Sequence, residues 1–294
     1  MQRVLLTGAS GLIGKSLMKI FAQNKKYRIY AITTNRAKLE EYDFVNIIEG
    51  DLCKEEFRKN IIELIKPNCI IHLAWDQTKK DFRKSNENLK WLNISMDLLY
   101  NFIESGGNRF IFAGSSSEYD GMNGTFTEED DITPISEYGK CKKLFSEFGK
   151  TYCENKCSFV SLRYFTIYGE NDSHYFGAIP ETVRKLKNNE DVFCNSPYTT
   201  RDYIYADDAA QITYDMIENN FEGIVNVATG KPQKMKDIFC TIGRALDKEN
   251  LVHINEDNKT IKEFNADIRL LNSLNIKKDM LDFKQRINNI IENY

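Results

Sequence analysis

The sequence predicts an α/β protein, in which a doubly wound parallel sheet is followed by a small lid at the C-terminal end. Short apolar runs alternate with amphipathic stretches through the first two thirds of the chain, a glycine-rich turn follows the first apolar run, and the alternation loosens after Gly169. Strands that alternate with helices pair in parallel through right-handed crossovers, and ligands bind outside the carboxyl ends of such strands.

The first fourteen residues carry the clearest pattern. The apolar run 3–6 predicts a buried strand, the turn Thr7-Gly8-Ala9-Ser10-Gly11-Leu12-Ile13-Gly14 follows it, and a helix is expected from this turn to Asn24. The three glycines allow a tight turn, a close approach of the backbone to a pyrophosphate, and close packing of helix on strand. Such a turn also occurs without a ligand, but the strand before it and the helix after it favour a dinucleotide site of the Rossmann type.

The remaining elements are expected in the same alternating order. Hydrophobic periodicity predicts strands over 27–33, 45–48, 69–74, 109–113, 159–164 and 223–228, helices over 55–65, 85–104, 136–155 and near 180–187, and a charged, helical tail from Lys231. We therefore assign residues 1–168, to which 201–229 return, to the dinucleotide-binding Rossmann domain. Residues 169–200 and 230–294 form the predicted substrate-binding lid.

Composition excludes several classes of function. Of the 294 residues 41% are hydrophobic and 28% charged, and no apolar stretch approaches the roughly 20 residues of a membrane span, so a cytoplasmic protein without a membrane partner is expected. The net charge of −3 gives no reason to expect nucleic acid. Seven scattered cysteines without a CxxC pair, and only three histidines, predict no metal site.

The end of the second strand bears on which dinucleotide fits. A carboxylate about 20 residues past the last glycine would bind the ribose of NAD, whereas the residues here are Thr34, Asn35 and Arg36, which suit the 2′-phosphate of NADP. NADP is favoured over NAD, although Arg36 could equally be a solvated residue at a helix start. After the third strand come Asp51 and Leu52; Asp51 could accept a hydrogen bond from the adenine amine or merely cap a turn.

A second group of residues suggests proton transfer. Ser115, Ser116 and Ser117 follow the fifth strand, and Tyr138 and Lys142 lie four residues apart on a predicted helix, so they share one face. A tyrosine is a poor base at neutral pH, but a neighbouring ammonium together with a positive nicotinium ring should lower its pKa. A serine hydroxyl can then hold the substrate oxygen while the tyrosine gives or takes the proton. A Tyr-x-x-x-Lys pair alone is common, whereas one that follows a dinucleotide turn and a serine-ended strand is specific.

With these motifs the sequence resembles the extended short-chain dehydrogenase/reductases, the NAD(P)-dependent epimerases, dehydratases and reductases of nucleotide sugars. The resemblance runs from Leu5 to about Gly230 and implies that Ser115, Tyr138 and Lys142 are catalytic. It implies cofactor contacts from Gly8, Ser10, Gly11, Leu12, Ile13, Gly14, Leu73, Ala74, Trp75, Asn93, Tyr138, Lys142 and Tyr164. Substrate contacts are implied for Ser116, Ser117, Thr166 and Arg201. It also implies a homodimer through the helices 85–104 and 136–155, although these helices could simply pack on the sheet.

Departures from the family pattern narrow the reaction. Dehydratases carry an acid pair where Ser116 and Ser117 stand, and Glu118 would point to the other side of an extended segment, so dehydration is disfavoured. Ser117 also replaces the cysteine of ring-inverting relatives, and His174 is displaced from the position of their histidine. Thr166 stands where asparagine is common, and His72 is expected in the core.

What these residues suffice for is hydride transfer with a proton from Tyr138. We therefore expect the protein to use NADPH to reduce a keto group at C4 of a nucleotide-linked, often 6-deoxy, hexose. The product would be used in the biosynthesis of surface polysaccharides. A 4-epimerase that retains NAD is the first alternative, and a non-catalytic NADP-binding protein is the second. In the lid, four aromatic residues could stack on the base or the sugar: Tyr175, Phe176, Phe193 and Tyr198.

Overall fold

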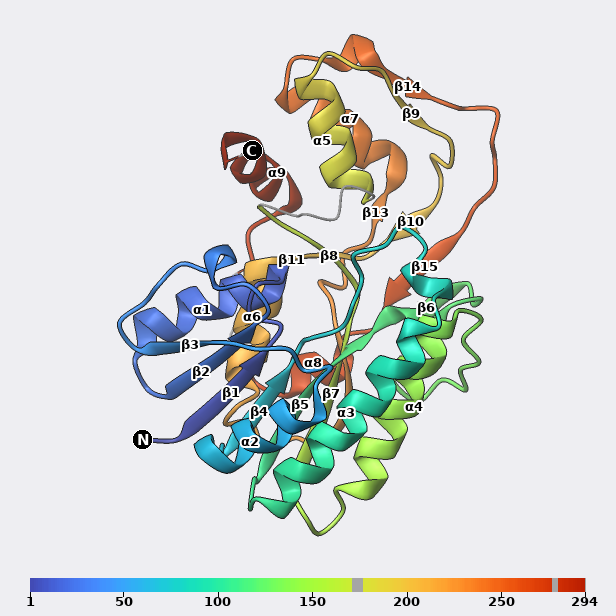
Figure 1. Cartoon of the computed structure of the whole chain (residues 1–294). Coiled ribbons are helices and arrows are strands. Elements are labelled where there is room, and N and C mark those ends of the chain that lie inside the picture. Colours follow the sequence, from blue (N-terminus) through green and yellow to red (C-terminus); the bar gives the residue numbers. More distant parts are fainter. Residues whose placement is uncertain (171–176, 277–279, 294) are drawn as a thin grey trace.

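The computed structural model describes residues 1–170, 177–276 and 280–293. Its centre is a parallel sheet of seven strands in the order β12-β7-β5-β4-β1-β2-β3 (Figure 1). These strands are β1 (Arg3–Thr7), β2 (Arg28–Thr33), β3 (Val45–Glu49), β4 (Cys69–His72), β5 (Arg109–Ser115), β7 (Ser158–Tyr164) and β12 (Gly223–Val227). They read as nearly continuous apolar runs because both faces of the sheet are covered.

Helices cover the two faces of this sheet, so the doubly wound architecture predicted from the alternating pattern is confirmed (Figure 1). One face holds α1 (Leu12–Asn24) and α6 (Ala206–Asp215), whose apolar side chains share one buried cluster. The other face holds α2 (Glu55–Ile65), α3 (Glu87–Glu104) and α4 (Glu137–Tyr152), whose apolar side chains belong to a second cluster.

A smaller body lies beyond the carboxyl ends of the strands (Figure 1). Its own apolar cluster is built by α5 (Ala178–Lys187), α7 (Met235–Ala245), α9 (Phe283–Asn293) and the strand pair β9 (Val192–Cys194) and β14 (Val252–Ile254). Two further sheets link the bodies: β8 (Thr166–Tyr168) with β11 (Tyr203–Tyr205), and β6 (Gly124–Phe126), β10 (Thr200–Arg201), β13 (Gln233–Lys234) and β15 (Glu263–Ala266). The short α8 (Arg269–Ser273) lies against β12.

The structure differs from the predicted elements mainly where pairing partners are distant in sequence. The tail after Lys231 is not simply helical, because β14 pairs with β9 and β15 pairs with β10 and β6, all of which come much earlier in the chain. Strand β5 continues to Ser115, since it pairs with β7 as far as Tyr164, whereas β4 already ends at His72. Among the described helices, none is both long and apolar enough for a bilayer crossing.

Candidate active site

The glycine turn between β1 and α1 is shaped by close backbone contacts. Gly8 has a φ of +72°, and a Cβ on it would lie 2.7 Å from the backbone nitrogen of Ala74 at the end of β4. A Cβ on Gly14 would lie 2.3 Å from the carbonyl oxygen of Gly8. Two of the three glycines are therefore required by the fold, whereas a Cβ on Gly11 would meet nothing closer than 3.2 Å.

The N-terminal end of α1 fits the diphosphate of a dinucleotide. Gly11 is the N-cap and offers no side-chain hydrogen bond to the helix, and no acidic residue lies in the first turn. The first N–H groups and the positive end of the helix dipole thus meet no carboxylate of the helix itself. Gly11 is exposed, and Ser10 and Leu12 are half-buried beside it.

Strand register brings the predicted catalytic residues to one edge of the sheet. In this register Thr7 pairs with His72 and Ser115 with Tyr164, so the segment after each strand lies next to its neighbour. Helix α4 is capped by Ser136, whose hydroxyl accepts a hydrogen bond from the Gly139 N–H at 3.0 Å. A Cβ on Gly139 would lie 2.1 Å from a carbonyl oxygen of the segment after β5, so this glycine lets α4 approach that segment closely.

Within this arrangement Tyr138 and Lys142 are both buried. The Lys142 ammonium donates a hydrogen bond to the carbonyl oxygen of Ala113 at 2.7 Å and lies 3.9 Å from the centroid of the Trp75 ring. The nearby Ser115 side chain lowers the pKa of Tyr138. Ser115, Tyr138 and Lys142 thus lie together at the carboxyl ends of β4 and β5.

In the protein by itself, burial determines the direction of the pKa shifts of Tyr138 and Lys142. Burial raises the pKa of Tyr138 to about 12, and burial lowers the pKa of Lys142 to about 7. The Lys142 ammonium lies 5.6 Å from the Tyr138 ring centroid and is engaged by the main chain of β5, so it does not bond the phenol oxygen. Sequence spacing put both side chains on one helix face, but it said nothing about how deeply that face is buried.

Sequence reasoning missed Gln77, which lies in the segment between β4 and α3. Its Nε2 donates a hydrogen bond to the Tyr138 hydroxyl at 2.7 Å. From the same segment the Phe82 and Trp75 rings pack edge-on against the Tyr138 ring, with centroids 5.1 and 6.1 Å away. No motif marks this glutamine, because its role depends on where a long connecting segment folds back.

Behind Ser115 lies a buried ion pair. The segment 116–119 forms a 3₁₀ turn instead of the extended stretch assumed from sequence, and the turn directs the Glu118 side chain into the core. Glu118 accepts hydrogen bonds from the Ser115 N–H at 3.0 Å and from Arg163 Nε at 2.7 Å. Arg163 also bonds the Tyr119 hydroxyl at 2.9 Å. Glu118 is therefore engaged inside the protein, which leaves no free acid directly after Ser115.

Arg36, Asn35 and Asp51, which are predicted to contact the cofactor, have hydrogen-bond partners in the protein. The Arg36 guanidinium donates to Glu41 at 2.9 Å and to the carbonyl oxygen of Ile47. Asn35 caps the short helical turn that follows, and Thr34 is exposed. Asp51 accepts from the Cys53 N–H at 2.9 Å, as a turn aspartate does. The Arg36–Glu41 ion pair is exposed, so binding of a phosphate by Arg36 would compete with this pair and stays a prediction.

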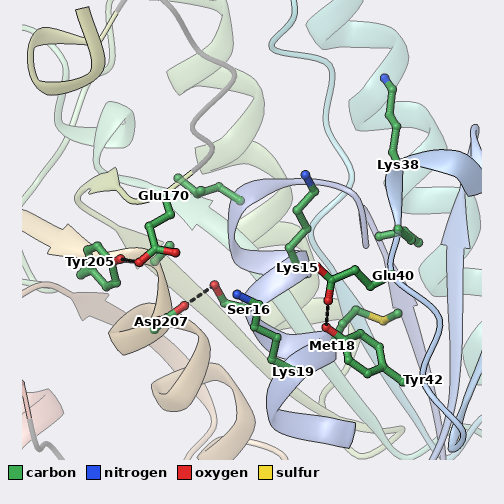
Figure 2. Close-up of a pocket in the computed structure, with 13 residues that line it drawn as sticks. Lys15, Ser16, Met18, Lys19, Lys38, Glu40, Tyr42, Glu170, Tyr205 and Asp207 are labelled. Carbon is green, nitrogen blue, oxygen red and sulfur yellow. Dashed lines mark hydrogen bonds between the residues drawn. The ribbon is translucent and has the colours of Figure 1, made fainter. Parts of the chain in front are cut away.

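A cavity of about 110 Å³ opens beside the first turns of α1 (Figure 2). It is lined by Leu12, Lys15 and Lys19 of α1, by Lys38 after β2, and by polar residues near the start of α6. Lys15 and Lys38 point in the same direction in Figure 2, and within the described ranges neither ammonium has a hydrogen bond or an ion pair. The carboxylates around this cavity are instead bonded to hydroxyl groups, as in Ser16 to Asp207 at 2.5 Å.

Several predicted contact residues are buried. Ile13, Leu52 and Ser117 have little exposed surface, and the Tyr164 hydroxyl bonds Thr213 of α6 at 2.6 Å within the core. For these four residues, contact with a ligand stays a prediction. Leu73, Ala74 and Ser116 are half-buried at the strand ends.

His72 of β4 and Asn93 of α3 lie in different surroundings. His72 lies in the core as expected, with ring nitrogens 2.7 Å from the Thr7 hydroxyl and 2.9 Å from the Ser95 hydroxyl, and burial lowers its pKa to about 3. Asn93 is exposed in a hollow between α2 and α3. A nearby amide of the same helix, Asn88, is buried and accepts a hydrogen bond from Trp75 Nε1 at 2.8 Å, which helps to position the Trp75 ring.

On the predicted substrate side, Thr166 and Arg201 are half-buried. The Arg201 guanidinium lies 5.5 Å from the Phe264 ring centroid. The next residue, Asp202, is fully buried and accepts from the Thr229 hydroxyl at 2.7 Å and the Gly230 N–H at 2.7 Å. It therefore fixes the loop after β12 against β10.

Of the lid residues predicted to bind substrate, Phe193 and Tyr198 have partners in the protein. His174, Tyr175 and Phe176 lie outside the described residues. Phe193 is exposed and stacks on a histidine ring of β14, and the Tyr198 hydroxyl bonds a glutamate at 2.5 Å. In the part of the chain that the structure describes, no group of three or more His, Cys, Asp or Glu side chains could hold a metal ion.

The chain is similar to known proteins over nearly its whole length. The sequence model of the NAD dependent epimerase/dehydratase family matches residues 4–228. The ADP-L-glycero-D-manno-heptose-6-epimerase of Fusobacterium nucleatum subsp. nucleatum is 26% identical, over 99% of this chain and 97% of that protein. The structure resembles UDP-N-acetylglucosamine 4-epimerase from Methanobrevibacter ruminantium in complex with UDP-N-acetylmuramic acid (TM-score 0.87, 22% identity, 99% and 97% coverage). It also resembles the UDP-glucose 4-epimerase of Thermus thermophilus in complex with NAD (TM-score 0.85, 19% identity, 99% and 98% coverage).

Proposed function

We propose that the chain, which belongs to the NAD-dependent epimerase/dehydratase family, reduces the C4 keto group of a nucleotide-linked hexose with NADPH. The hexose is often a 6-deoxy sugar. The observation that carries this proposal is the joint placement of Ser115, Tyr138 and Lys142 at the ends of β4 and β5, beside a glycine turn that fits a diphosphate. The product would serve the synthesis of surface polysaccharide in the cytoplasm.

The cofactor supplies and accepts hydride, and the chain's own residues do the rest. The Ser115 hydroxyl holds the sugar oxygen, and Tyr138 Oη gives its proton to that oxygen. Elimination of water needs a further free acid beside Ser115, and Glu118 is engaged with Arg163. Dehydration is therefore disfavoured for a second, structural reason.

Two lysines, Lys15 and Lys38, support the proposal that NADP is the cofactor, and in this proposal they bind its 2′-phosphate instead of Arg36. In the described part of the chain both ammonium groups lack protein partners, and they flank the cavity between the glycine turn and the segment after β2, the region where a 2′-phosphate is bound in this architecture. An ammonium–phosphate contact is a charge-assisted interaction, and its loss should weaken NADPH about tenfold. NADH, which lacks the phosphate, should be affected little.

The test is an assay of nucleotide-linked keto sugars in which the consumption of NADPH and of NADH is followed by absorbance. A reductase consumes external cofactor in proportion to product, and Tyr138→Phe should abolish turnover while cofactor binding is kept. Turnover of the Tyr138→Phe protein within about threefold of wild type would exclude Tyr138 as the proton donor.

A 4-epimerase with retained NAD is the second candidate, because relatives that are similar over the whole chain are named epimerases. The same serine, tyrosine and lysine serve both reactions. Product formation without consumption of external NADPH, together with NAD released on denaturation, would favour this alternative. A homodimer formed through α3 and α4 stays a prediction, for which a mass measurement in solution is the test.

A further inference from the structure

The segment 73–86 between β4 and α3 covers the hydroxyl of Tyr138. Trp75 and Phe82 pack on its ring, and Gln77 Nε2 lies 2.7 Å from its oxygen. Gln77 is half-buried, and its amide nitrogen can only donate a hydrogen bond. It therefore contacts the very atom from which the proton has to leave.

The surroundings of Tyr138 on balance disfavour its phenolate form. Burial of Tyr138 disfavours its charged form, and among the charged groups that face it, Glu118 and Asp120 disfavour the phenolate while Arg83 favours it. The Lys142 ammonium is bound to the main chain of β5 instead of the phenol oxygen. Stabilisation of the phenolate by the protein thus falls largely to the groups that donate directly to its oxygen.

We propose that Gln77 is a catalytic residue, which stabilises the phenolate of Tyr138 by a hydrogen bond from its amide nitrogen. When hydride reaches the carbonyl carbon, the O–H bond of Tyr138 breaks and its proton joins the substrate oxygen. The electron pair stays on Tyr138 Oη, which Gln77 and Ser115 then hold. This inference rests on the proposed function only in taking Tyr138 as the proton donor.

Two substitutions separate this role from simple packing. Gln77→Leu keeps an apolar stem of similar size but removes the donor, and Gln77→Glu keeps the shape but places a carboxylate beside the phenol. We expect Gln77→Leu to raise the pKa of Tyr138 by about one unit, which is about a tenfold change in acidity, and Gln77→Glu to raise it further. Thr78→Ala, an exposed neighbour that bonds Asp76 at 2.7 Å, is the matched control and should leave this pKa unchanged.

The readout is a ¹⁹F NMR titration of protein that contains 3,5-difluorotyrosine, whose more acidic phenol ionises while the protein stays folded. The Tyr138 signal is identified by its absence from Tyr138→Phe, and circular dichroism and NADPH binding verify the fold. A pKa that is unchanged or lowered in Gln77→Leu would overturn the inference. Because the titration needs no substrate, it decides about Gln77 even if no keto sugar is reduced.

With an active substrate the same variants should lower kcat about tenfold and leave KM nearly unchanged, since the hydrogen bond strengthens as charge develops on the tyrosine oxygen. An increase of KM alone would instead assign Gln77 to substrate binding and would contradict a catalytic role.

Discussion

The ion pair between Glu118 and Arg163 should dominate the stability of the region behind the site. Both side chains are almost fully buried, at 0% and 3% exposure, and they meet at 2.7 Å. Burial by itself lowers the pKa of Arg163, but Glu118 and Tyr119 together more than offset this and the pKa is raised. In Glu118→Gln the shape and the hydrogen-bond acceptor for the Ser115 N–H are kept, whereas the charge that compensates Arg163 is lost.

Removal of one partner from a buried pair costs about 3–5 kcal/mol, because the other charge is left without compensation in a medium of low polarity. We therefore expect the free energy of unfolding of Glu118→Gln, measured by urea denaturation, to fall by about that amount. The double variant Glu118→Leu/Arg163→Met removes both charges and should regain most of the loss. A decrease below about 1 kcal/mol in Glu118→Gln would show that the pair is not the compensated buried charge described above.

Three further predictions concern the glycine turn, the buried lysine and the cofactor. Gly14→Ala should destabilise the protein by about 1–3 kcal/mol, since its Cβ would lie 2.3 Å from a backbone oxygen. Gly11→Ala, whose Cβ would lie 3.2 Å from the carbonyl oxygen of Gly8, should destabilise the protein less and should weaken cofactor binding. Equal melting temperatures for both variants would contradict the steric argument. The pKa of Lys142 is about 7 in the folded protein and near 10.5 when unfolded, so the unfolded state binds more protons between these pH values. As the pH rises above about 7, the wild-type protein should therefore gain about 1.4 kcal/mol of unfolding free energy per pH unit relative to Lys142→Met, measured by urea denaturation. A difference that stays constant with pH would refute the depressed pKa. Lys38→Gln should weaken NADPH about tenfold by fluorescence titration, while Arg36→Gln should change NADPH affinity less than about twofold; the reverse order would restore Arg36 as the phosphate ligand.

Local patterns were sufficient for the architecture and for naming the candidate residues of the site. Strands buried on both faces have to be nearly continuous apolar runs, and covering helices have to be amphipathic, so the order of elements can be read from residues close in sequence. The close contact of Gly14 is equally local, because the strand–turn–helix unit itself brings the carbonyl oxygen of Gly8 near. The pair Tyr138 and Lys142 follows from helical spacing alone.

The tertiary structure decided everything that depends on contacts between distant segments. Glu118 meets Arg163 only because β5 pairs with β7, and Gln77 reaches Tyr138 only because the segment after β4 folds over α4. Arg36, which looks free in the sequence, is bonded to Glu41 and to β3. The charge state of a side chain also depends on its burial and its neighbours in space, which spacing along the chain does not specify. The sequence by itself therefore determined which groups are present at the strand ends, and the packing of remote segments determined which of them are free to act.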